Sequence, residues 1–207
     1  GKGPAHLVAE HGFAGFGAAM PLNPERVEGA GDYDYINPLN PGSFAYVFRQ
    51  GVFEQRLLID AVSELTIDPA VLSDCVGPTL PAGETSFRFA VEPLMLMGQS
   101  MGGQYSNLLA AVDPRVMAVV PTGAGGHWSK FIRVSQLFGG LAPLFAGLFN
   151  LIHEDTHELH PIIHLLQQAW GPADALESVP RLALDPLPGH PARPVYQPVG
   201  RAALFFP

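Results

Sequence analysis

The stretch Leu94–Gly103 reads L-M-L-M-G-Q-S-M-G-G and decides the fold of this chain. Its apolar start predicts a buried strand, and the residues from Tyr105 to Val112 predict a helix shortly after it. Gly98-Gln99-Ser100-Met101-Gly102 forms the tight turn between the two elements. A serine at the tip of such a turn takes strained backbone angles, so small residues are expected two positions before and two after it. Gly98 and Gly102 meet that expectation.

This turn places the Ser100 hydroxyl at the end of the strand, where it can meet a ligand. The following helix directs its first backbone N–H groups at the same place, and these groups stabilise negative charge that develops on an oxygen. Ser100 is therefore the candidate nucleophile, and the Met101 N–H is a candidate oxyanion donor.

The rest of the chain alternates between strand and helix patterns. The strongest helix pattern runs from Phe44 to Leu65, and Arg115–Pro121 is a second buried-strand run that a Gly-rich loop closes. Further patterns predict helices at residues 5–11, 130–170 and 173–184, and strands at residues 13–20, 87–91 and 194–200. This order predicts one α/β domain over residues 1–207, with a doubly wound, mostly parallel sheet between two helical layers.

The strand, elbow and helix resemble the α/β-hydrolase superfamily, in particular its bacterial lipase and esterase branch. The resemblance implies a three-layer α/β/α fold with a helical cap insertion at residues 130–184. It also implies cleavage of a small-molecule carboxylic ester through an acyl-enzyme on Ser100, without a cofactor. Lipases, esterases and peptidases share this elbow, so the substrate stays open.

A substrate pocket is expected around the elbow and the insertion. Residues 138–152 are apolar nearly all round, which suits either a cap over an acyl group or a part of the domain core. The predicted pocket residues are Gln99, His127, Leu144, Phe145 and Leu148. His127 follows the Gly-rich loop and is expected to have a pocket or surface role rather than to act as the base.

A serine nucleophile also needs a histidine base and an orienting carboxylate. In this family they follow the serine in the order acid and then histidine, and residues 200–207 contain neither. We therefore expect both beyond Pro207 and the second oxyanion donor before Gly1, as in a fragment that lacks both ends. Asp174 and Asp185 are internal alternatives for the acid, although capping or turn duty suits them better. A non-catalytic binding protein with the same fold is the second hypothesis.

A third hypothesis comes from His153-Glu154-Asp155-Thr156-His157, which matches the H-E-x-x-H pattern of zinc hydrolases. His160 and His164 extend the histidine series, but Pro161 is expected to start a new helix and to break the shared face. We expect partly buried histidines at a helix end, and no metal site.

The bulk composition excludes several classes. A formal net charge of -8 argues against nucleic acid as a partner, and the single Cys75 excludes an internal disulfide framework. The apolar stretch 137–152 contains Pro143 and several glycines, so it is too short and broken for a membrane-spanning helix. Localisation and oligomeric state stay open, and the resemblance is compatible with export.

Overall fold

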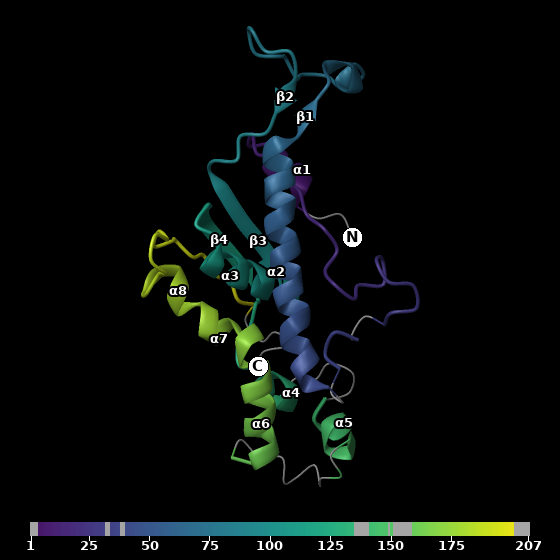
Figure 1. The fold of residues 1–207 in the computed structure, drawn as a ribbon, viewed down its shortest axis with the longest axis vertical. Helices are drawn as coiled ribbons and strands as arrows, with labels where there is room; N and C mark the ends of the chain where they lie inside the picture. Colours follow the sequence, from purple (N-terminus) through teal and green to yellow (C-terminus); the bar gives the residue numbers. More distant parts are fainter. Residues whose placement is uncertain are drawn as a thin grey trace.

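The computed structural model describes residues 4–31, 34–37, 40–134, 141–148, 150 and 159–200. It is a mixed α/β structure, elongated along one long helix, with a small central sheet beside that helix (Figure 1). The mixed α/β class predicted from the sequence is confirmed.

The long helix α2 spans Pro41–Glu64, close to the predicted 44–65. Pro41 suits its first turn, where the missing N–H costs nothing. Its inward face enters an aromatic cluster in which Phe48 stacks on Tyr105 with ring centroids 4.5 Å apart, and Phe44 meets Trp128 edge to face at 4.7 Å. These aromatic contacts join α2 to the helix Met101–Val112 through Tyr105 and to the helix Trp128–Val134 through Trp128.

The central sheet consists of β3 (Leu94–Gln99) and β4 (Val116–Thr122), which run parallel in the register Gln99↔Thr122. The segment 194–198 continues the sheet on the far side of β4. The Val119 N–H donates to Pro194 O at 3.2 Å, and the Tyr196 N–H donates to Val119 O at 3.0 Å, so this segment is also parallel. The predicted last strand is thus present as a short bridge.

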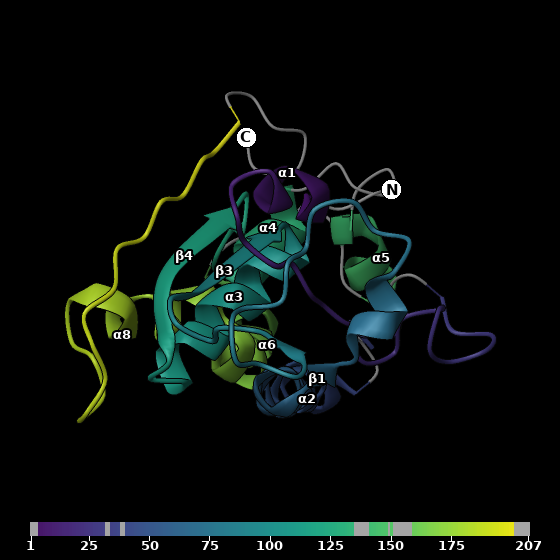
Figure 2. The ribbon, with the colours of Figure 1, turned by 90° about the horizontal axis from the view of Figure 1, so that it is seen from above.

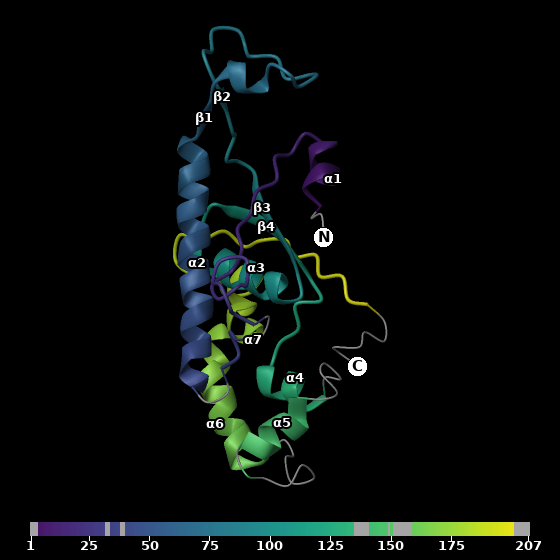
Figure 3. The same cartoon turned by 90° about the vertical axis from the view of Figure 1, so that its right-hand side faces the viewer.

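One face of the sheet is covered by helices. Helix α3 (Met101–Val112) packs on both strands, and α2 packs on α3 (Figures 2 and 3). On the opposite face Met95, Met97 and Met117 are 46%, 50% and 47% exposed. Helix α1 (Ala5–Ala9) lies on that side of the sheet but buries no residue. The second helical layer of a doubly wound fold is therefore not seen in the described ranges, and that part stays a prediction.

After β4 the described chain is mostly helical, as predicted for residues 130–170. The helices pack partly into the main core, because Ile132, Leu166, Trp170 and Leu182 are all buried. Residues 173–184 form two short helices rather than the predicted one, with Pro180 opening the second. The elements are α4 (Trp128–Val134), α5 (Leu141–Leu148), α6 (Pro161–Trp170), η4 (Gly171–Ala173), α7 (Ala175–Ser178) and α8 (Pro180–Ala183).

Two strand predictions need correction. Residues 13–20 form no strand and are mostly exposed, because glycines interrupt them and no described strand pairs with them. The run 87–91 gives only β2 (Phe87–Arg88), which pairs antiparallel with β1 (Thr66–Ile67) rather than joining the central sheet. Together with η1 (Pro69–Leu72), these strands form a protrusion at one end of the molecule (Figure 1).

A buried charge cluster closes the end of the sheet opposite the elbow. Asp113 is fully buried between α3 and β4, and its carboxylate accepts hydrogen bonds from Arg115 Nη2 at 2.6 Å and from Arg56 Nε at 3.3 Å. Burial alone would raise the pKa of Asp113, but these guanidinium groups outweigh it and hold the pKa below its ordinary value. Asp113 therefore stays ionised and ties α2 to the α3–β4 turn.

No helix among the described residues is both long enough and apolar enough to cross a membrane.

Candidate active site

The turn between β3 and α3 has the strained geometry expected for a nucleophile elbow. Ser100 has φ 54° and ψ -118°, which lies outside the regions that a residue with a Cβ normally occupies. Its neighbours fix this conformation. The Ser100 N–H donates to Thr122 O of β4 at 2.9 Å, and the Ser100 carbonyl accepts from Gly103 N at 3.0 Å and from Gln104 N at 3.2 Å. The backbone strain, which costs on the order of 1–3 kcal/mol, is held by the sheet and the helix together.

The two flanking glycines of the motif differ in their surroundings. A Cβ on Gly98 would overlap the Gly102 carbonyl and would lie 2.7 Å from Gly103 N, so any larger residue there would displace the helix start. A Cβ on Gly102 would meet nothing within 4 Å. The expectation that both positions must be small is therefore wrong for Gly102. Gly103 is the second constrained position, because its Cβ would lie 2.9 Å from Ala124 Cβ.

Ser100 and Met101 lie where a parallel strand ends and a helix begins. Ser100 is exposed at the carboxyl end of β3, and Met101 is the first residue of α3. The N–H groups in the first turn of a helix have no acceptor within that helix, and they carry the positive end of its dipole. The Met101 N–H belongs to this first turn, so its role as an oxyanion donor stays a prediction that the helix start is compatible with.

The other predicted pocket residues are dispersed. Gln99 is exposed and alternates with Met95 and Met97, so it lies on the uncovered face of the sheet. Leu148, on α5, is 39% exposed. The side chains of Leu144 and Phe145 lie outside the described residues. Their role in a pocket stays a prediction.

His127 lies at the same edge of the sheet as Ser100, on the loop that follows β4. It has φ 61°, and its ring is oriented by Ser129 Oγ, which lies 3.1 Å from His127 Nδ1. The Lys130 N–H also donates to His127 Nδ1, at 3.4 Å. Because a backbone N–H can only donate, Nδ1 is the acceptor and the neutral ring carries its proton on Nε2. Nδ1 is thus occupied by groups at the start of α4, and the pocket or surface role of His127 stays a prediction.

Asp174, one of the two alternative acids, is engaged in backbone hydrogen bonds. It is fully buried and caps α7, with Leu176 N donating to Oδ1 at 2.9 Å. Its carboxylate also accepts from the N–H groups of His127 and Trp128, at 2.8 and 3.0 Å, and from Gln167 Nε2 at 2.8 Å. With two donors on each oxygen, Asp174 has no lone-pair direction left for a catalytic histidine. The capping interpretation is confirmed.

Asp185 lies at the end of α8 and pairs with Arg181, four residues earlier, in an exposed ion pair. This ion pair lies at the end of α8, in agreement with the turn role that the sequence favoured for Asp185.

The zinc hypothesis depends on residues that are only partly described. His153 and His157 lie outside the described residues. Pro161 starts α6 as predicted, and His160 caps that helix by accepting from Ile162 N at 3.2 Å. His164 is exposed on α6. Within the described ranges, no three metal-ligating side chains gather into a site.

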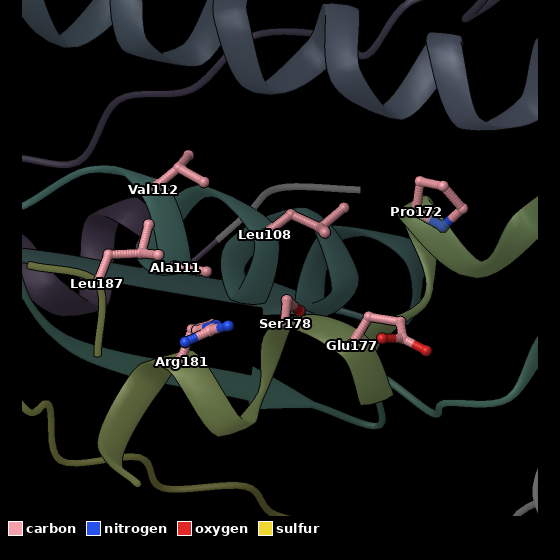
Figure 4. A pocket seen from close by; sticks show the side chains of 8 residues that line it. All are labelled: Leu108, Ala111, Val112, Pro172, Glu177, Ser178, Arg181 and Leu187. Carbon is pink, nitrogen blue, oxygen red and sulfur yellow. The ribbon is translucent and has the colours of Figure 1, made fainter. Parts of the chain in front are cut away.

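A cavity of about 250 Å³ lies along the second half of α3 (Figure 4). Leu108 and Val112 form one wall, and Ser178 and Arg181 form the opposite wall. Leu108 is eight residues from Ser100, which corresponds to roughly 12 Å along a helix. The cavity is thus separate from the elbow, and none of the predicted pocket residues lines it.

Sequence reasoning missed the support around the elbow. Thr122 O, Ala124 and Asp174 fix the backbone around Ser100 and the neighbouring loop. The only signal for this support in the sequence was the second glycine of the pair Gly102-Gly103, which marks a close approach. No protein-family model, curated protein or solved structure matches this chain.

Proposed function

We propose that this chain is a serine hydrolase that cleaves carboxylic esters through an acyl-enzyme on Ser100. The observation that carries the proposal is the backbone of Ser100, at φ 54° and ψ -118° between a parallel strand and a helix N-terminus. Strained backbone of this kind persists only where the surrounding structure enforces it, and such residues cluster at active sites and ligand-binding sites. The proposal includes a larger α/β-hydrolase sheet with a helical cap over the elbow and an apolar acyl or alcohol group in the substrate.

The chemistry follows from this geometry. The Ser100 Oγ attacks the ester carbonyl carbon, while its proton passes to a general base and the carbonyl oxygen becomes an oxyanion facing the Met101 N–H. Collapse of this intermediate expels the alcohol, which takes up the proton. Water then attacks the acyl-enzyme, releases the carboxylic acid and restores the Ser100 hydroxyl. The base and its acid partner remain to be assigned.

The alternative is a binding protein that keeps the fold without catalysis. One observation favours it: within the described ranges, no hydrogen bond joins the Ser100 hydroxyl to a histidine. A nucleophilic serine is weak without an adjacent base. The two candidates differ in whether the Ser100 oxygen reacts.

Hydrolysis of p-nitrophenyl esters of short and long acyl chains tests the proposal. Wild type is expected to release p-nitrophenol above the rate in buffer, and Ser100→Ala is expected to abolish this activity. Ser106→Ala is the matched control, because Ser106 lies on the same helix and its hydroxyl only donates to Gly102 O. Activity that survives in Ser100→Ala would overturn the proposal, as would inactive wild type.

A further inference from the structure

We propose that Asp174 is a positioning residue for the reaction at Ser100, because it holds the loop Gly123–His127 against the nucleophile elbow. This inference rests on the proposed function, since it gives Asp174 a part in the reactivity of Ser100. The carboxylate comes from the segment between η4 and α7, 74 residues after the serine in the chain. It acts through the backbone of the loop and touches no reacting atom.

The Asp174 carboxylate accepts four hydrogen bonds. The side chain is fully buried, and each carboxylate oxygen accepts two N–H donors from separate parts of the chain. His127 N and Leu176 N donate to Oδ1, whereas Trp128 N and Gln167 Nε2 donate to Oδ2. An ionised carboxylate forms stronger hydrogen bonds than a neutral acceptor does. The end of the loop is therefore tied at once to α6 and to α7.

The other side of the same loop meets the elbow. Thr122 O accepts the Ser100 N–H just before the loop, and Ala124, which is fully buried, lies against Gly103. A Cβ on Gly103 would lie 2.9 Å from Ala124 Cβ, so the loop and the helix start are in close contact. Movement of the loop therefore changes the support of the strained Ser100 backbone.

Gly126 completes the connection between Asp174 and the loop. A Cβ at this position would lie 3.2 Å from Leu176 Cγ and 3.9 Å from Asp174 Oδ1. The loop is thus packed between α7 on one side and the elbow on the other. Loss of one side is expected to loosen the nucleophile without unfolding the sheet.

Asp174→Asn is the variant that tests this inference. The amide replaces one acceptor oxygen with an N–H₂ group, so one pair of donors loses its partner whichever way the amide is turned. We expect the rate constant of Ser100 modification by a fluorophosphonate, at saturating reagent, to fall about tenfold or more, because small misplacements of a reacting group cost up to about 10²-fold. The reagent concentration at half-saturation is expected to change little. A purely structural role would lower the fraction of reactive protein and leave the rate constant of that fraction unchanged.

Asp68→Asn is the matched control. Asp68 also caps a helix, η1, by accepting an N–H two residues on, but it lies in the exposed protrusion. Its substitution is expected to leave the labelling rate unchanged. An Asp174→Asn variant that is folded by circular dichroism and labels at the wild-type rate would overturn the inference.

A second readout separates this inference from the proposed function. If wild type is not labelled, the proposed function fails, and Ser100→Cys in a Cys75→Ser background then reports on the elbow through its alkylation rate with iodoacetamide. Thiolate reactivity depends on the local N–H groups and helix terminus, so Asp174→Asn is expected to change this rate about threefold or more. An unchanged alkylation rate would overturn the inference.

Gly126→Ala keeps the test decisive if Asp174→Asn does not fold. The added methyl presses the loop away from Leu176 without altering a buried charge. It is expected to reduce the same labelling or alkylation rate in the same direction, by about threefold or more. A folded Gly126→Ala variant with wild-type rates would contradict the role of this loop.

Discussion

The strained backbone of Ser100 is compensated by three hydrogen bonds, to β4 and within the start of α3. The glycines around it have separate functions. Gly98 permits the approach of α3 to β3, and Gly103 permits the approach of the loop after β4. At Gly102, despite its place in the motif, an added Cβ would meet no neighbouring atom within 4 Å.

This difference gives a prediction at the residue scale. Gly98→Ala is expected to lower the free energy of unfolding by about 3 kcal/mol, because its methyl overlaps backbone that cannot move aside. Gly102→Ala is expected to be neutral or to stabilise the protein by up to about 1 kcal/mol, since alanine favours a helix. Urea unfolding of both variants measures this. Equal destabilisation by the two substitutions would contradict the geometry of the elbow.

Residue-scale prediction from the sequence succeeded where the signal was local. The elbow could be predicted because strand, glycines, serine and helix lie within a few neighbouring residues. The capping role of Asp174 could also be predicted, from the helix that follows it. Its bonds to His127 and Trp128 could not, because they join residues 47 and 46 positions apart and no local pattern encodes that pairing.

At the scale of elements, α3 connects the two parallel strands β3 and β4. Ser100 lies at the turn before α3, and Asp113 lies at the turn after it. Its carboxylate connects Arg56 of α2 to Arg115, which directly precedes β4. Arg193, buried just before the third sheet segment, donates to the Asp113 and Val116 carbonyls at 2.9 and 2.8 Å. The turn at Asp113 thus holds together α2, the start of β4 and the segment that precedes residues 194–198.

The lowered pKa of Asp113 predicts how the free energy of unfolding depends on pH. Because the folded protein holds the pKa of this carboxyl below its unfolded value, its contribution to stability is present above the unfolded pKa of about 4 and is lost as pH falls through the folded value. Asp113→Asn is expected to cost about 2 kcal/mol at pH 7 and to flatten the fall in stability below about pH 4. Urea unfolding at a series of pH values measures both effects.

Asp60→Asn is the control, because Asp60 also pairs with Arg115 but its side chain is 54% exposed. Its cost is expected to stay below about 1 kcal/mol. A similar cost for both variants would show that burial of Asp113 is unimportant.

Element prediction failed where a strand needed a distant partner. Residues 13–20 have the apolar character of a strand but no described strand beside them, and hydrophobic pattern alone does not supply a ladder of hydrogen bonds. By contrast, β4 and the segment 194–198 could be predicted, because each is a short run with valine or tyrosine that glycine or proline bounds.

At the scale of the whole molecule, the protrusion contributes no residue to the hydrophobic core clusters of the body. The core clusters lie along α2, α3, β4 and the later helices, and they include no residue from 66 to 88. Those residues form the protrusion at the end of α2 (Figures 1 and 3). Thr66 and Arg88 are paired neighbours, so the chain returns to its starting point.

Replacement of residues 66–88 by a short Gly/Ser turn is therefore expected to change the free energy of unfolding by less than about 1 kcal/mol, because loop length affects stability only weakly. Reactivity at Ser100 is expected to be unchanged. Urea unfolding and labelling of the shortened chain check this expectation. A loss of several kcal/mol would show that the protrusion supports the core.

Covalent labelling of Ser100 tests the central claim most directly. Intact mass and peptide mapping after treatment with a fluorophosphonate are expected to show one adduct, located on Ser100. Ser63 is the internal control, because it is an exposed serine on α2 outside any elbow and is expected to stay unmodified. An adduct on Ser100 that Ser100→Ala abolishes is the predicted result, whereas an unlabelled folded chain, or equal labelling of Ser63, would contradict the account.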